Sequence, residues 1–209
     1  MHEETFTVSE RFICNRSPVL KTACSTEWPV GQSKTVRLPD IAPRHFQIYL
    51  DWADSYGRAS MMGLIEKTCL QLDGGKKMEV HLLLEVNYLC NLWTLGNALQ
   101  DSKFKNHVMD EILKHELPKR RLLVPATIGD AIQEATSDSK LRSWMLDHMA
   151  PQVTTKYLDD IRSWLPADFA YELMSKIVAI RGKSKGEGVP GYEDRCKYHE
   201  HPAGMASCR

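Results

Sequence analysis

Apolar and polar residues alternate in two short stretches near the start of the chain. Phe6 and Val8 alternate with threonines, and Val36 and Leu38 face one side of a second stretch that Pro39 ends. A period of two is typical of half-buried strands, because successive side chains of a strand point to opposite faces. The pattern therefore predicts two short strands in this part of the chain.

Farther along the chain, the apolar residues recur at helical spacing. A stripe over residues 46–53 predicts a helix that begins at Pro43. Residues 81–99 are apolar nearly all round, which predicts a helix at the centre of the fold. Single stripes predict further helices over residues 102–115, 128–135, 141–148, 157–165 and 170–177. Two short strands followed by helices predict an α+β fold that is strongly α-rich.

The composition places the chain among ordinary globular proteins. It has 209 residues, of which 43% are apolar and 26% are charged. The 27 basic and 27 acidic side chains cancel, which argues against general binding of nucleic acid or of an acidic membrane surface. Because no apolar signal segment follows the acidic first residues, we predict a cytoplasmic or nuclear location, or both, with mostly reduced cysteines.

No catalytic signature occurs in the structural context that it requires. Residues 182–186 (GKSKG) and 186–191 (GEGVPG) have the spacings of Gly-x-Ser-x-Gly and Gly-x-Gly-x-x-Gly, but they lie in a stretch without strand or helix periodicity, and no His-Glu-x-x-His occurs. The adjacent carboxylates Asp110 and Glu111 splay apart by about 100° on a helix, so they are expected to be solvated rather than paired. We therefore predict that the chain is not an enzyme, that it has no catalytic residues (catalytic: none) and that it needs no cofactor.

Four residues near the end of the chain have the side chains of a zinc site. They are Cys196, His199, His201 and Cys208, and four such ligands would close a tetrahedral structural site. Their spacing is not that of a standard zinc finger, and residues 182–209 show no periodicity. The four residues are therefore candidates only: the alternatives are a flexible tail and a zinc-stabilised transcriptional or nucleic-acid cofactor.

Three stretches together resemble the BTB/POZ domain in the form common in filamentous fungi. They are residues 6–18 (FTVSERFICNRSP), residues 46–52 (FQIYLDW) and residues 92–101 (LWTLGNALQD). The family motifs place these side chains in the structural core: Phe6, Val8, Ser17, Phe46, Leu50, Trp52, Leu92, Trp93, Leu95, Leu99, Phe104 and Val108.

The resemblance implies a fold in which a sheet of two or three short strands packs against a helical bundle with additional C-terminal helices. It implies a BTB/POZ-like domain over residues 5–117, a helical extension over 118–181 and a flexible tail over 182–209. The family's first strand would precede Phe6, so this strand is truncated here. The truncation is expected to weaken self-association.

For function, the resemblance implies a protein-interaction module, acting as adaptor or scaffold, with protein partners that the sequence does not name. Some members of the family link a partner to a cullin-type ubiquitin ligase, so a cullin is one predicted partner. No nucleic acid or membrane is expected as a partner. A degenerate domain with little residual binding is an alternative, as is the zinc-stabilised cofactor.

Overall fold

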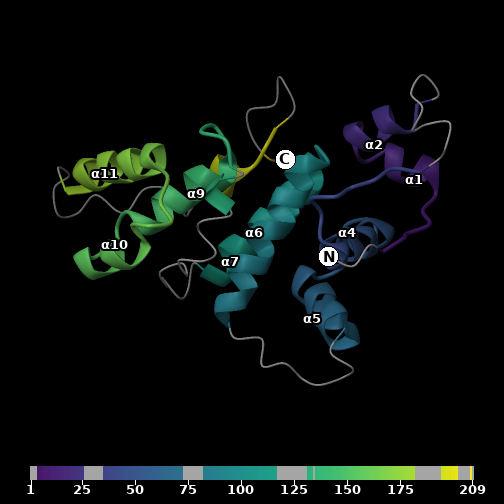
Figure 1. The fold of residues 1–209 in the computed structure, drawn as a ribbon, viewed down its shortest axis with the longest axis horizontal. Helices are drawn as coiled ribbons and strands as arrows, with labels where there is room; N and C mark the ends of the chain where they lie inside the picture. The colour runs from purple at the N-terminus through teal and green to yellow at the C-terminus, as the bar shows by residue number, and fades with distance from the viewer. Residues whose placement is uncertain are drawn as a thin grey trace. The chain divides into compact units, whose positions relative to one another are not determined.

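The computed structural model describes residues 4–25, 35–72, 82–116, 131–133, 135–181, 194–201 and 208 (Figure 1). Within these ranges, 66% of the residues are helical and there is no strand. The predicted α+β fold with a small BTB/POZ-like sheet is therefore wrong, because helices are the only regular secondary structure in the part of the chain that the structure describes.

Among the described residues, no strand lies beside the stretches predicted as strands. The ring of Phe6 instead meets the ring of Phe46 edge-on, with centroids 5.4 Å apart, and Val8 is 37% exposed. Residues 35–38 also form no strand. Two alternating apolar side chains are a weak signal, because a strand is stable only beside hydrogen-bonded neighbours and over a shared apolar face.

Contacts within the chain divide it into two compact units. The first unit comprises residues 1–79 and 95–105, and the second comprises residues 80–94 and 106–209. The division falls within helix α6 (Leu82–Ala98) and helix α7 (Ser102–Glu116), so each of these helices contributes to both units. The predicted domain boundaries at residues 117 and 181 stay predictions.

The first unit begins with two short helices, α1 (Glu10–Cys14) and α2 (Pro18–Ala23). Ser17 caps α2, because its Oγ accepts a hydrogen bond from the backbone N–H of Leu20 at 3.1 Å. The same hydroxyl donates to the carbonyl oxygen of Leu99 at 2.7 Å. One fully buried serine thus both begins a helix and joins it to the end of α6.

The core of the first unit is aromatic. It lies between α4 (Pro43–Asp54) and the first turn of α7, and α5 (Met61–Leu72) packs on α4. The Phe104 ring meets Tyr49 and Trp52 nearly edge-on, at centroid distances of 5.0 and 4.8 Å. The Tyr49 hydroxyl donates to Asp101 at 3.1 Å, and Asp101 in turn caps α7. The amphipathic helix predicted to begin at Pro43 is confirmed.

The second unit contains most of α6 and α7 together with α9 (Lys140–Met149), α10 (Thr155–Ile161) and α11 (Ala167–Arg181). Arg142 of α9 is only 3% exposed, and its guanidinium lies over the ring of Phe169. It donates to Asp168 at 2.6 Å and to Glu172 at 3.0 Å. This buried cation therefore joins α9 to α11 by both charge and packing.

Most of the side chains that the family motifs place in the core are buried. Phe6 and Leu50 are half-buried, and Val8 is exposed. The buried ones are Ser17, Phe46, Trp52, Leu92, Trp93, Leu95, Leu99, Phe104 and Val108. No helix among the described residues is long and apolar enough to cross a membrane.

Candidate metal centre

The C-terminal candidates lie on and after a short 3-10 helix, η1 (Arg195–Tyr198), which packs on α9. Asp194 begins η1 by accepting a hydrogen bond from the backbone N–H of Cys196 at 3.0 Å. Lys140 of α9 donates to the carbonyl oxygen of Lys197 at 3.0 Å. Tyr198 is 1% exposed, so this part of the predicted tail is packed within the second unit.

Asp147 of α9 is the main polar attachment point for η1. It accepts hydrogen bonds from the Tyr198 hydroxyl, at 2.9 Å, and from the ammonium groups of Lys197 and Lys176. Burial alone would raise the pKa of this carboxyl, but the three donors outweigh burial and lower the pKa below its ordinary value. Asp147 is therefore held as a carboxylate that joins α9, α11 and η1.

Asn106 of α7 holds the backbone between the two candidate histidines. Its Nδ2 donates to the carbonyl oxygen of Glu200, and its Oδ1 accepts from the Glu200 N–H, both at 2.8 Å. Two hydrogen bonds from one amide fix both the position and the orientation of this peptide. The side chains of His199 and His201, on either side of it, are therefore placed by α7.

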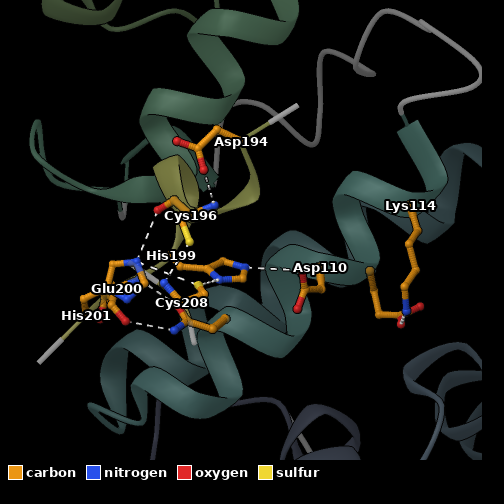
Figure 2. Close-up of polar contacts among 10 residues, drawn as sticks. Asp110, Lys114, Asp194, Cys196, His199, Glu200, His201 and Cys208 are labelled. Atoms are coloured by element: carbon orange, nitrogen blue, oxygen red, sulfur yellow. Dashed lines mark hydrogen bonds and ion pairs between the residues drawn. The ribbon is translucent and has the colours of Figure 1, made fainter. Parts of the chain in front are cut away.

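Figure 2 shows the four candidates converging at one point beside α7. The ligand atoms of Cys196, His201 and Cys208 all lie within 4.8 Å of one another. His199 is not part of this group of three but touches it, with its Nδ1 atom 2.9 Å from the Cys208 Sγ. The Nε2 atom of His201 lies 3.9 Å from the same sulfur. The structure thus brings together all four residues whose side chains suggested zinc.

The second nitrogen of His199 faces a carboxylate. Nε2 lies 3.3 Å from Oδ1 of Asp110 on α7, and the imidazole is 8% exposed. In metal sites, a ligating histidine typically gives its other ring N–H to a carboxylate, which fixes the tautomer and the orientation of the ring. His199 lies between Asp110 and the cluster as in this pattern, with a close charge contact to the carboxylate in place of a hydrogen bond (Figure 2).

Cys208 is held next to Cys196. Its backbone N–H donates to the Cys196 Sγ at 2.9 Å. Its hydrogen bond with the Cys196 side chain, with a smaller contribution from burial, raises the pKa of the Cys208 thiol to about 11. A divalent metal acts in the opposite direction, because coordination deprotonates a thiol and the cation compensates the charge of two neighbouring thiolates.

The donor set fits zinc. Two thiolates and two imidazoles in a tetrahedron are typical of structural Zn²⁺ sites. Four such ligand atoms around one zinc lie about 3.3 to 3.8 Å apart, given the usual Zn–S and Zn–N bond lengths. The distances of 2.9 and 3.9 Å to the Cys208 sulfur bracket this range. Cys196, His201 and Cys208 therefore form the core of the donor set, and His199 reaches it through its contact with Cys208.

Sequence reasoning missed the residues that support the cluster. Asp110 is 32% exposed and also faces His199, a contact that the sequence does not predict, and no motif assigns Asn106 a role at a metal site. The contact of Asn106 with Glu200 spans 94 residues. No local pattern could have indicated a contact between segments so far apart in the chain. Comparisons with protein-family models, curated proteins and solved structures found no match.

Proposed function

We propose that this chain is a non-enzymatic protein-interaction module in which a structural zinc ion holds the C-terminal segment against α7 and α9. The observation that carries the zinc centre is the convergence of Cys196, His201 and Cys208, with His199 in contact with Cys208 and Asp110 behind His199. Cys196, His199, His201 and Cys208 would be the ligands. Zinc in this role supplies folding energy rather than chemistry.

The number of ligands supports a structural rather than a catalytic ion. Catalytic zinc keeps an open position for water or substrate beside three protein ligands, whereas four protein ligands close the coordination sphere. The fourth ligand here is His199, which is 6% exposed and backed by Asp110. A buried histidine held in this way would stay on the metal, so no coordination position would open for water or substrate.

The interaction role is supported by a surface of the second unit. On α11, Tyr171, Met174 and Val178 are 70%, 55% and 70% exposed and lie at helical spacing on one face. Contiguous exposed apolar side chains are typical of surfaces that bind other proteins. The adaptor role and the cullin partner implied by the BTB/POZ resemblance, and the cytoplasmic or nuclear location, stay predictions.

The zinc centre is tested by counting the metal. The full chain, purified under reducing conditions, is expected to carry one zinc ion per molecule by inductively coupled plasma mass spectrometry. Cys196→Ser and Cys208→Ser should each lose most of the zinc, because zinc prefers a thiolate to a hydroxyl. Cys24→Ser is the matched control, since Cys24 lies in the first unit.

Replacement of zinc by Co²⁺ gives an independent readout. A tetrahedral site with two thiolates should show thiolate charge-transfer absorption, which Cys208→Ser should reduce and Cys24→Ser should leave intact. Wild-type protein that binds zinc far below one ion per chain would overturn the proposal. So would zinc that stays bound after both Cys196 and Cys208 have been replaced.

A further inference from the structure

Cys196 and Cys208 form a pair of neighbouring thiols at the surface. Their sulfur atoms lie within 4.8 Å of each other. Cys208 is exposed and Cys196 is partly exposed, whereas Cys90 in α6 is buried. A small solute can therefore reach this pair, and susceptibility of a cysteine to oxidation follows both thiolate character and exposure.

We propose that Cys196 and Cys208 are a redox modification site, at which oxidation by a peroxide joins the two sulfurs and releases the zinc ion. This inference rests on the proposed zinc centre, because coordination is what keeps both sulfurs as thiolates. The reduced pair holds the metal, and the oxidised pair does not. The centre would then respond to peroxide as well as stabilise the fold.

The step balances with hydrogen peroxide as the oxidant. The Cys208 thiolate attacks one peroxide oxygen, the O–O bond breaks, and hydroxide leaves a sulfenic acid on Cys208. The Cys196 thiolate then attacks that sulfur, forms the S–S bond and expels a second hydroxide. Two protons convert the hydroxides to water. Each sulfur loses one electron, the peroxide gains two, and the zinc stays Zn²⁺ throughout.

The geometry permits both the formation of the disulfide and the release of zinc. A disulfide requires sulfurs about 2.05 Å apart, so the pair must close by a further short movement, which the exposed Cys208 can make. Two of the four ligands are then lost, and two histidines alone bind zinc weakly. The contacts of Tyr198 with Asp147 and of Asn106 with Glu200 use no sulfur. The segment therefore stays attached, and reduction can rebuild the site.

The experiment treats the zinc-loaded full chain with hydrogen peroxide in the presence of a chromogenic zinc chelator. We expect release of one zinc ion per chain, together with a loss of mass equal to two hydrogen atoms and a Cys196–Cys208 linkage in the peptide map. A thiol reductant followed by zinc should restore the metal content. Cys24→Ser should behave as the wild type.

The two proposals fail in different ways. Protein that never carries zinc overturns the zinc centre before any peroxide is added. Protein that carries zinc and keeps it under peroxide, or that releases zinc without a Cys196–Cys208 linkage, overturns the redox site and leaves the zinc centre standing. Release that cannot be reversed by reductant also overturns the redox site, because it indicates oxidation beyond the disulfide.

Discussion

Gly96 lies at a close approach between the end of α6 and the start of α7. A Cβ atom at this position would lie 2.8 Å from Cγ of Lys105 and 2.9 Å from a ring carbon of Phe104. Alanine normally stabilises a helix relative to glycine, by about 1 kcal/mol. Here we expect the opposite for Gly96→Ala, a loss of about 1–2 kcal/mol, because the overpacking outweighs the helix propensity.

The matched control for this prediction is Gly63→Ala in α5. The atom nearest to a Cβ there is Cβ of Ser60, at 3.7 Å, and the position is exposed. This variant should gain about 0.5–1 kcal/mol of stability. Denaturant midpoints of both variants provide the measurement. A stabilised Gly96→Ala would show that α6 and α7 do not approach so closely.

His45 couples the stability of the first unit to pH. Burial, with a smaller contribution from the charge of Arg44, lowers the pKa of this imidazole from 6.5 to about 4. As the pH falls below 6.5, His45 takes up a proton in the unfolded chain, whereas in the folded chain it does so only near pH 4. Stability is therefore complete above pH 6.5 and falls toward pH 4, by roughly 2 kcal/mol after partial solvent access is allowed for.

The measurement compares the wild type with His45→Gln, which removes the titrating group. Free energies of unfolding from urea titrations should converge between the two proteins as the pH falls from 6.5 to 4, whatever their difference at neutral pH. Parallel pH profiles would mean that His45 takes up its proton as readily in the folded chain as in the unfolded one.

At the scale of the elements, one amide supplies two hydrogen bonds between α7 and the segment after η1. Asn106→Ala removes both hydrogen bonds to the Glu200 backbone. We expect a loss of about 1–2 kcal/mol, because the partly buried peptide at Glu200 also loses its partner. The loss should be seen with zinc present and after chelation, since the hydrogen bonds do not involve the metal.

Asn91→Ala on α6 is the control for this substitution. Asn91 is exposed, and alanine has the better helix propensity, so the expected change is small or slightly stabilising. Thermal unfolding of the three proteins, with and without a chelator, checks the prediction. Equal midpoints for Asn106→Ala and the wild type would mean that the Asn106–Glu200 contact adds nothing to stability.

The elements also show what a sequence pattern can and cannot predict. The stripes of α4 and α7 span several turns, and an apolar period of 3.6 over that length is typical of a helix alone. The strand predictions relied on two apolar residues each, as in Phe6 and Val8. A strand depends on a neighbouring strand that can lie anywhere in the chain, so such a short alternation has little predictive value.

At the scale of the whole molecule, half of the candidate site was predictable. The types of side chain singled out Cys196, His199, His201 and Cys208, because few combinations of residues resemble zinc ligands so closely. Their convergence was not predictable, since it depends on α7 and α9, which supply Asp110, Asn106 and Asp147 from distant parts of the chain. The chemistry of a ligand can be read from its own residue type, whereas the residues that hold the ligand in place come from distant parts of the chain.

The late position of η1 has a consequence for how the protein is made. Asp147 of α9 leaves the ribosome well before Lys197 and Tyr198, which are two of its three hydrogen-bond donors. During synthesis, the second unit therefore passes through a stage in which α9 and α11 exist while the side chains that complete their packing are still missing. A nascent chain halted at that stage would leave Asp147 without two of its three donors, and the arrival of η1 would supply them.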